Sequence, residues 1–519
     1  MIASNLDLLL FASLCVLLLA GYPVTFTLAG LAVAFGFLGA ALGAFDLGLL
    51  GALAQRTFGI MTNDVLMAIP LFVFMGVVLE RSRIAEELLE EMGHLFGSQP
   101  GGLAVAVMLV GTLLAASTGI VGATVVTMAM IALPTMLRHG YGKGFAAGSV
   151  CTAGTLGQII PPSTMLIILA EVMSTSFQQA QYAQGLFSIQ TISVGQVFAA
   201  ALVPGLVLVA IYTAFILIAA RRVPGLAPAM PTTAAVDLRR LLAVLVPPIV
   251  LIVAVLGSIL GGIATPTEAA AVGAVGALML AGLRLTPSPW TKGAVALALV
   301  AIVAMLVLTA HVDLRLGRRA PSPAEVIWVR VAMGLTGLVA LGLLVCLVQA
   351  LRAGVLVPVL TRTMTITSMI FATIIGASLF ALVFRGLGGD YRIHGILEAM
   401  PGGPEMALLF VMVLIFLIGF FLDFVEISII ILPITTPALL LMGIDPIWLA
   451  VLIAINLQTS FLTPPFGFSL FYLRGAAPPE ITTVALYQGV IPFILLNLLG
   501  ILVIYAFPPL ATWLPRALF

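Results

Sequence analysis

Apolar residues recur along this chain in runs of close to 20, separated by shorter polar or charged segments. A helix rises about 1.5 Å per residue, so about 20 apolar residues cross the roughly 30 Å hydrocarbon core of a membrane. The pattern therefore predicts an all-α protein with many spans. The predicted straight spans are 6–22, 24–43, 65–80, 195–220, 241–262, 266–283, 361–384 and 483–507, with two further apolar runs at 293–311 and 327–351.

Two pairs of apolar arms are too short to form two comfortable spans each. The first pair covers 101–116 and 119–137, and Ser117-Thr118-Gly119 joins its arms. The second pair covers 405–420 and 424–441. Each pair predicts a re-entrant hairpin that enters and leaves the membrane on the same side.

A charged helix is expected at 84–96, directly before the first hairpin. One stripe of this helix is apolar and the opposite face carries glutamates, so the helix is predicted to lie along the membrane surface. The stripe consists of Ile84, Leu88, Met92 and Leu95, and the glutamates are Glu86, Glu87, Glu90 and Glu91. A long uncharged polar loop is expected at 176–194.

Two further apolar runs, 144–175 and 446–473, are interrupted by the pairs Pro161-Pro162 and Pro464-Pro465. Proline lacks an N–H donor and its ring clashes with the preceding turn, so two in succession unwind a helix. Backbone exposed at membrane depth persists only where protein, water or a solute satisfies it, and paired broken helices are typical of a transporter's binding site. The alternative is that each pair is a turn at the membrane edge.

The order of elements indicates an internal repeat. Pro266 follows Pro23 by 243 residues, whereas Pro433 follows Pro134 by 299 and Pro464 follows Pro161 by 303. The offset grows by about 60, which places an insertion at 284–352 that holds two extra spans. We predict a first repeat at 1–222, a linker at 223–240, and a second repeat at 241–283 and 353–519. Each repeat has five spans and one hairpin, and this odd number of crossings makes the repeats inverted.

The basic residues favour one orientation in the membrane. With the N-terminus outside the cytoplasm, 13 of the 21 basic residues lie in or beside inner loops, where positive charge is favoured, although Arg315, Arg318 and Arg319 do not follow the rule. The 13 residues are Arg81, Arg83, Arg138, Lys143, Arg221, Arg222, Arg239, Arg240, Arg284, Lys292, Arg352, Arg362 and Arg474.

Composition supports a membrane protein and excludes several other classes. The 519 residues are 62% hydrophobic and 8% charged, whereas charged residues make up about a quarter of soluble domains. A formal net charge of +1 gives no indication of a nucleic-acid partner. Three cysteines in apolar runs predict neither a disulfide framework nor a metal site. Residues 6–22 lack the flanks of a cleaved signal and are expected to be a retained span.

Several motifs resemble the large membrane subunit of tripartite ATP-independent periplasmic (TRAP) transporters. They are MAIPLFVFMG, PGGLAVAVMLVGTLLAASTGIVGAT, GYGKGFAAGSVCTAGTLGQIIPPS, GIATPTEAAAVGAV and GIDPIWLAVLIAINLQTSFLTPPFGFSLF. The chain departs from the family's usual pattern in Thr-Gly-Ile-Val at the first tip, in Phe-Val-Glu after Asp423, and in the 284–352 insertion. The resemblance implies a sodium-driven, elevator-type importer in the bacterial inner membrane, with a small four-span membrane subunit and a periplasmic binding protein as partners.

The resemblance also implies that the hairpin tips and broken helices hold sodium and substrate. The sodium residues are then expected among Ser117, Thr118, Gly119, Thr155, Gly157, Asp423, Thr459, Ser460 and Thr463. The substrate residues are expected among Gln158, Pro161, Pro162, Ser163, Gln458, Pro464 and Pro465. The expected substrate is a small carboxylate.

The chemistry of these residues is compatible with both a functional and a structural role. Sodium is a hard cation that takes oxygen ligands, which hydroxyls and unwound carbonyls supply. The same hydroxyls commonly hydrogen-bond between membrane helices. Asp423 and Glu426 share a helix face, and a carboxylate at membrane depth costs at least about 2.5 kcal/mol. This cost favours a functional role for Asp423 and leaves the role of Glu426 open; alternatively both cap the second arm at the surface. Glu268, which follows Thr265-Pro266-Thr267, is expected to cap its helix.

Three alternatives have different requirements. A sodium and carboxylate symporter without a binding protein would share the same fold. An intramembrane enzyme would need a nucleophile and base, a metal pair or a phosphate loop, none of which occurs at a recognisable spacing. A channel would not explain an inverted repeat with two hairpins and two broken helices. The pattern favours the transporter.

Overall fold

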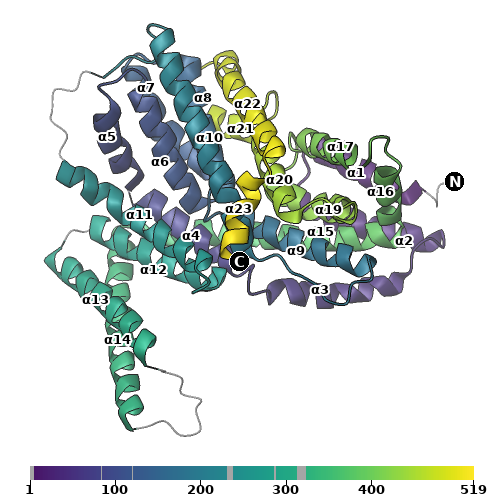
Figure 1. Cartoon of the computed structure of the whole chain (residues 1–519), viewed down its shortest axis with the longest axis horizontal. Helices are drawn as coiled ribbons and strands as arrows, with labels where there is room; N and C mark the ends of the chain where they lie inside the picture. Colours follow the sequence, from purple (N-terminus) through teal and green to yellow (C-terminus); the bar gives the residue numbers. More distant parts are fainter. Residues whose placement is uncertain (1–4, 83, 120, 231–237, 286–287, 313–322) are drawn as a thin grey trace.

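The computed structural model describes residues 5–82, 84–119, 121–230, 238–285, 288–312 and 323–519 (Figure 1). The regular elements in these ranges are all helices. Nine of the described helices are long and apolar enough to cross a membrane, or ten if one bent pair counts as a span. The predicted fold class, an all-α polytopic membrane protein, is therefore confirmed.

The first half of the chain holds the elements up to the first long polar linker. They are α1 (Leu6–Leu19), α2 (Val24–Ala41), η2 (Leu47–Gly51), α3 (Ala52–Met61), α4 (Ala68–Arg81), α5 (Ile84–Phe96), α6 (Gly102–Thr118), α7 (Val121–Arg138), α8 (Lys143–Thr155), η3 (Leu156–Gln158), α9 (Thr164–Ala183) and α10 (Val194–Arg222).

The second half holds the remaining elements. They are α11 (Leu238–Leu260), α12 (Pro266–Leu285), α13 (Pro289–His311), α14 (Pro323–Arg352), α15 (Leu356–Gly386), α16 (Gly389–Glu398), α17 (Gly403–Ile418), α18 (Phe424–Ile430), α19 (Leu432–Leu441), α20 (Pro446–Leu462), α21 (Phe468–Ala476), α22 (Thr483–Ala506) and α23 (Pro509–Leu518).

Helices from the two halves pack on each other in matching pairs. α4 packs on α12, and α2 packs on α15. α7 packs on α21, while α19 packs on α9. Each hairpin therefore contacts the broken helix of the other half, so the residues flanking the two breaks are brought into one region.

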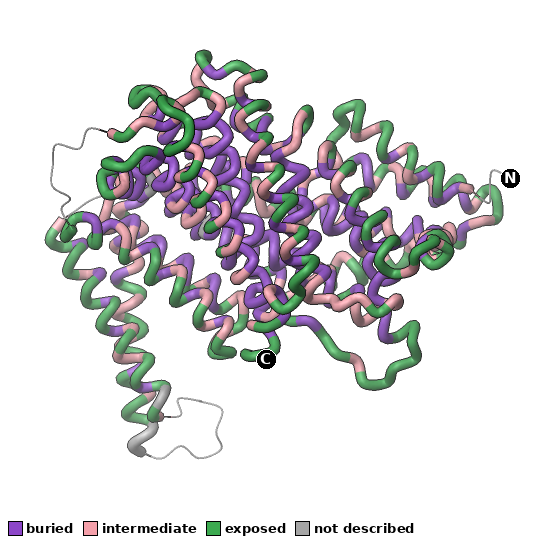
Figure 2. Tube along the Cα trace, turned by 45° about the horizontal axis from the view of Figure 1, so that its top comes forward, coloured by how far each residue is buried: buried purple, intermediate pink, exposed green. Residues whose placement is uncertain are grey.

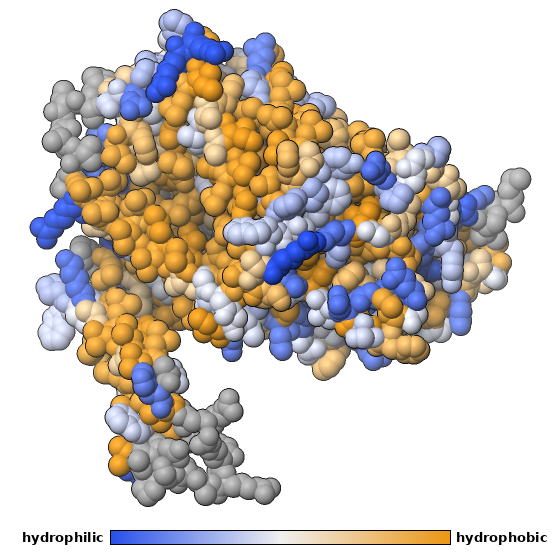
Figure 3. Space-filling model, in the orientation of Figure 1, coloured by the Kyte–Doolittle hydropathy of each residue, from blue (hydrophilic) through white to orange (hydrophobic). Residues whose placement is uncertain are grey.

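Buried residues are concentrated in the middle of the molecule, and the outer faces of the long helices are exposed (Figure 2). These outer faces are themselves apolar: Phe26, Val253 and Leu502 are among the exposed large side chains, and orange surface dominates the view in Figure 3. Apolar faces on both sides of a span are expected when lipid surrounds the helix.

Several sequence-based predictions of element boundaries were wrong. α9 continues to Ala183, into the stretch 176–194 that was expected to be a loop. The second arm of the second hairpin is bent by 56° between α18 and α19. Pro433 follows the bend directly, and its missing N–H and ring account for the interruption. η2, α3, α16 and α23 were not predicted, because none of them contains a long apolar run.

The charged helix α5 is present at the predicted residues, but its acidic face is not wholly exposed. Ile84, Leu88 and Met92 are buried, as the apolar stripe predicts, whereas Leu95 is exposed. Glu91 is buried, with 5% of its surface exposed, because it pairs with Arg240. The prediction that all four glutamates cover an exposed face is therefore wrong for Glu91.

The α13–α14 pair, which occupies most of the predicted insertion, projects from the body of the molecule (Figure 1). The two helices pack mainly on each other and on α12, where Cys346 lies against Gly282. None of the residues expected to bind sodium or substrate lies on these two helices.

Candidate functional site

The first interrupted helix breaks where the proline pair predicts. α8 ends at Thr155, the short turn η3 follows, and α9 restarts at Thr164. The peptide bond between Pro161 and Pro162 is cis. All residues from Leu156 to Ser163 are buried, so the unwound segment is enclosed by protein. The Ser163 hydroxyl donates a long, 3.5 Å hydrogen bond to the Gln158 carbonyl across the break.

The second interrupted helix breaks in the same way but is more open. α20 ends at Leu462 and α21 begins at Phe468, with a cis peptide bond between Pro464 and Pro465. Pro465 is exposed, and its carbonyl accepts a 2.9 Å hydrogen bond from the Tyr487 hydroxyl. The two breaks therefore differ in their access to the surroundings.

The two breaks touch each other through predicted site residues. The side-chain amide of Gln458 donates a 3.4 Å hydrogen bond to the hydroxyl of Thr155, which in turn donates to the Thr152 carbonyl at 2.8 Å. Within the described part of the chain, Gln458 Oε1 and both amide atoms of Gln158 are buried without a hydrogen-bond partner. A buried amide without a hydrogen-bond partner costs free energy, so these three atoms mark a place suited to a polar ligand.

The first hairpin tip packs on the first break through two glycines. Gly119 ends α6 with a positive φ of 61°, and its carbonyl accepts a 3.1 Å hydrogen bond from the Thr164 hydroxyl. A Cβ on Gly157 would lie 2.3 Å from the Ala115 carbonyl oxygen, so only glycine allows this approach. The side chains of Ser117 and Thr118 lie outside the part of the chain that the structure describes.

The second hairpin tip is capped by two carboxylates. Asp423 is the N-cap of α18 and accepts a 2.7 Å hydrogen bond from the Phe424 N–H. Glu426 reaches back and accepts from the Asp423 N–H at 2.9 Å. This capping box is the structural role that the sequence left open for both residues. Asp423 is half-buried, and one face of it remains available to the space beside the tip.

A cavity of about 90 Å³ joins these elements. Gly119 of the first tip, Thr164 of the first break, Asp423 of the second tip and Phe461 beside the second break all line it. Ile370 of α15 closes it on another side. Both hairpin tips and both breaks therefore meet at this cavity, and α15, which belongs to neither hairpin nor broken helix, forms another of its walls.

The hydroxyls beside the second break are already engaged with backbone carbonyls. Thr459 donates to the Ile455 carbonyl at 2.9 Å, Ser460 to the Phe416 carbonyl at 2.8 Å, and Thr463 to the Thr459 carbonyl at 2.7 Å. Ser460 thereby joins α20 to the first arm of the second hairpin. Each oxygen keeps a lone pair, so a role as cation ligand stays a prediction for all three.

One polar residue beside the site was not predicted. Asn497 of α22 is fully buried and donates a 2.8 Å hydrogen bond to the Thr459 hydroxyl, while its carbonyl oxygen accepts from Tyr212 of α10 at 2.9 Å. The detectable signal was a single asparagine within a long apolar span, a placement that is costly without a partner. Asn497 holds the helix that leads into the second break.

The two hairpin tips and the two breaks, together called the junction, supply oxygen atoms of hydroxyls, amides and carbonyls and one carboxylate, that of Asp423, in the cavity. These are the ligands that a hard cation such as sodium takes, and the unpaired amide oxygens of Gln158 and Gln458 fit that requirement. The same amides can also hydrogen-bond a polar organic solute. The arrangement is suited to binding and release, and both halves of the chain contribute to it.

Comparison with known proteins identifies relatives along almost the whole chain. A family model described as the DctM component of the tripartite ATP-independent periplasmic transporter matches residues 11–316 and 319–510. The C4-dicarboxylate TRAP transporter large permease protein DctM of Pseudomonas aeruginosa is 30% identical over 468 residues, which cover 90% of this chain and 89% of that protein. The ectoine/5-hydroxyectoine TRAP transporter large permease protein UehC of Ruegeria pomeroyi is 25% identical, covering 97% of each.

A solved structure shares the fold. The YdaH transporter of Alcanivorax borkumensis aligns with a TM-score of 0.56 over 99% of each chain, at 16% sequence identity.

Proposed function

This chain belongs to the family of DctM components of tripartite ATP-independent periplasmic transporters, and from that premise we propose that it imports a small organic carboxylate by coupling to sodium. As a large permease subunit it is a multi-pass membrane transporter and not an enzyme. In our proposal it works in the bacterial inner membrane, receives its substrate from a periplasmic binding protein, and pairs with a small four-span membrane subunit.

The observation that supports this proposal most is the junction of the two tips and two breaks. Gly119, Thr164 and the half-buried Asp423 line the cavity there, and the buried, unpartnered amide atoms of Gln158 and Gln458 lie close to the two breaks but outside the lining of that cavity. Polar groups left unpaired at membrane depth are explained if a cation and a polar solute complete them. We place sodium near Thr155, Gly119 and Asp423, and the substrate near Gln158 and Gln458.

We further propose that the halves are inverted repeats and that one domain moves against the other. The pairing of α4 with α12 matches that of α2 with α15, and the pairing of α7 with α21 matches that of α19 with α9. This reciprocity supports a two-fold relation between the repeats. The hairpins and broken helices form the mobile domain in this proposal, and α1, α2, α4, α11, α12 and α15 form the static domain. The chain then begins outside the cytoplasm.

A symporter that needs no binding protein is the second candidate, because the same junction would serve it. Relatives with different named substrates, C4-dicarboxylate and ectoine/5-hydroxyectoine, share this chain's length and fold family. The relatives' names therefore point to no single substrate, and the proposal is made for small organic carboxylates as a class. Uptake by proteoliposomes without any binding protein would favour the symporter.

Thermal unfolding of the purified chain in detergent tests the sodium site. A ligand present at about 100 times its Kd stabilises the folded state by about 2.7 kcal/mol, so sodium should raise the Tm relative to potassium at equal ionic strength. The rise should saturate with sodium concentration. Equal melting temperatures in the two salts up to a few hundred millimolar would contradict sodium binding at this site.

A further inference from the structure

Each hairpin is preceded by a short charged helix and a Pro-Gly-Gly joint. α5 leads to Pro100-Gly101-Gly102, and α16 leads to Pro401-Gly402-Gly403. The second motif follows the first by 401 − 100 = 301 residues, close to the offsets of the other proline pairs. Gly101 and Gly402 both have positive φ, at 80° and 108°. α5 and α16 therefore occupy equivalent positions in the two halves.

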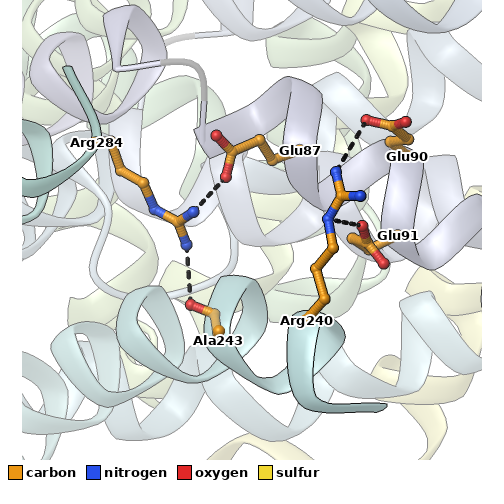
Figure 4. A network of polar contacts seen from close by, with 6 residues as sticks. All are labelled: Glu87, Glu90, Glu91, Arg240, Ala243 and Arg284. Carbon is orange, nitrogen blue, oxygen red and sulfur yellow. Dashed lines mark hydrogen bonds and ion pairs between the residues drawn. The ribbon is translucent and has the colours of Figure 1, made fainter. Parts of the chain in front are cut away.

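The acidic face of α5 is paired with two arginines from the second half (Figure 4). Arg240, in the first turn of α11, lies 2.7 Å from Glu91 and 4.0 Å from Glu90. Arg284, in the last turn of α12, lies 2.6 Å from Glu87 and also donates a 2.9 Å hydrogen bond to the Ala243 carbonyl. The base of the first hairpin is thus tied to α11 and α12.

α16 is paired with the first half, but here the short helix carries the arginine and its partner carries the carboxylate. Arg392 of α16 lies 2.6 Å from Asp7, in the first turn of α1, and its guanidinium also donates to the Asn5 side chain at 3.2 Å. The Asp7 side chain is 2% exposed, as the Glu91 side chain is 7% exposed. Arg385, near the end of α15, adds a second ion pair to Asp390 of α16 at 3.0 Å.

The two pairs, each a buried carboxylate with an arginine that is partly exposed, coincide under the repeat with their charges reversed. Arg392 follows Glu91 by 392 − 91 = 301 residues, the same interval that separates the Pro-Gly-Gly joints. Their partners, Arg240 and Asp7, both stand in the first turn of the first helix of the other half. The paired residue of the short helix is acidic in the first half (Glu91) and basic in the second (Arg392). Its partner in the other half has the opposite charge in each case.

We infer that Glu91–Arg240 and Asp7–Arg392 are equivalent clamps of opposite polarity that fix each short helix to the first helix of the other half. The clamps keep α5 and α16 with the static domain, so that the hairpins move from the Pro-Gly-Gly joints. These four residues are positioning residues, because they act on the tips through the hairpin bases. The inference rests on the proposed movement.

Burial and charge sign give the clamps both strength and selectivity. Removing the arginine leaves a buried carboxylate without its counter-charge, so Asp7 and Glu91 depend on their partly exposed arginines. Exchange of partners is disfavoured, since α5 against α1 would oppose two carboxylates and α16 against α11 would oppose two guanidiniums. The reversal also agrees with the proposed orientation, because it leaves the basic end of α11 on the cytoplasmic side.

Cross-linking in the reconstituted full chain tests the clamp and the domain movement separately. In a background with Cys15, Cys151 and Cys346 changed to alanine, one variant carries Glu91→Cys and Arg240→Cys. The matched variant carries Glu80→Cys and Thr127→Cys, which replace a 2.9 Å hydrogen bond between α4 and α7. A short bifunctional thiol reagent joins each pair, and uptake is measured before joining, after joining and after reduction.

Before joining, the Glu91/Arg240 variant should show uptake about tenfold below the background, because it lacks the clamp, and joining should restore uptake to within about twofold. Joining the Glu80/Thr127 pair should abolish uptake until the link is reduced. Loss of uptake on joining Glu91 to Arg240 overturns the clamp. Unchanged uptake on joining Glu80 to Thr127 contradicts the proposed movement of the mobile domain against the static domain. That result would count against the proposed function and not against the clamp itself.

The Asp7–Arg392 clamp is tested by exchanging its charges. Asp7→Arg and Arg392→Asp should each lower the maximal uptake rate about tenfold and leave KM unchanged, because neither residue contacts the site. The double variant restores the opposite charges and should recover most of the rate. A double variant that folds and inserts like the wild type but transports no better than the single variants overturns the equivalence of the two clamps.

Discussion

Thr155 and Gln458 are 303 residues apart in sequence, yet they are hydrogen-bonded at the junction of the two breaks. Each also stands beside a proline pair. The hydroxyl of Thr155 is a donor to its own helix and an acceptor for Gln458, so it holds the end of α8 against α20. Because Thr155 is hydrogen-bonded both within α8 and to α20, a ligand bound at either break would change its contacts.

Thr155→Val should lower the apparent sodium affinity roughly three- to tenfold, because a neutral oxygen contact of about 0.5–1.5 kcal/mol is lost without a change in side-chain shape. Sodium-dependent uptake is the measurement. Ser149→Ala is the matched control: Ser149 is also buried in α8, and its hydroxyl donates to the Phe145 carbonyl, away from the break. Equal sodium dependence in the two variants would remove Thr155 from the site.

Asp423→Asn should reduce uptake at least tenfold but leave insertion and melting temperature close to those of the wild type. Asparagine caps a helix about as well as aspartate, so the capping box survives while the negative charge is lost. Asp46→Asn, which changes the capping carboxylate of η2, is the control. If both variants transport normally, Asp423 is a cap and nothing more.

At this scale the sequence predicted the residues that flank the breaks but not the partners that hold them. Gln158, Ser163 and Gln458 stand near prolines whose effect on a helix is local, so their position followed from the pattern. Asn497 belongs to a straight span, and its bond to Thr459 depends on how α22 packs on α20. That packing is a tertiary property that no local pattern specifies.

Among the helices, a proline pair alone does not break a span. Pro247-Pro248 lie inside α11, which continues from Leu238 to Leu260 without interruption. Membrane helices tolerate proline where neighbouring groups satisfy the freed backbone. The broken pairs differ in their surroundings, since Gly157 and Ser163 flank the first and Thr463 and Gly467 flank the second. Glycine and hydroxyl residues allow the chain to leave the helix.

Changing both prolines of one broken pair to alanine should abolish uptake while the melting temperature stays equal or rises. The change restores two N–H donors and removes about 3 kcal/mol of helix cost per proline, which favours closure of the helix and loss of the junction. The double change Pro247→Ala and Pro248→Ala in α11 is the matched control and should leave uptake unchanged. Retained uptake with normal sodium affinity at either broken pair would show that the break is not needed.

The long apolar helices were predicted to within a few residues because lipid imposes length and composition on a span. α3 and α16 were not predicted, because they are too short and too polar to show the length and composition that lipid imposes on a span. α3 is ten residues long and contains Arg56, and α16 is also ten residues long and carries Asp390 and Arg392. Their positions depend on contacts with α15 and α19, which the periodicity of a short segment does not reveal.

For the molecule as a whole, the reciprocal packing of the halves leaves α13 and α14 outside the arrangement. Deleting residues 288–352 removes two crossings and keeps a short loop between α12 and α15, so the orientation of the remaining helices is retained. Uptake should persist at no less than about half the wild-type rate, because the site lies elsewhere. Deleting only 288–312 removes one crossing and should abolish uptake. Loss of sodium-dependent uptake in a stable two-helix deletion would give the pair a role in transport.

If the junction couples sodium to carboxylate uptake, the initial rate of uptake depends on the sodium gradient. The full chain is reconstituted in proteoliposomes with the proposed small subunit and binding protein, and the rate is measured with an inward sodium gradient or with potassium in its place. We expect rapid uptake that saturates with sodium and falls to background in potassium. Equal rates in the two salts would contradict it.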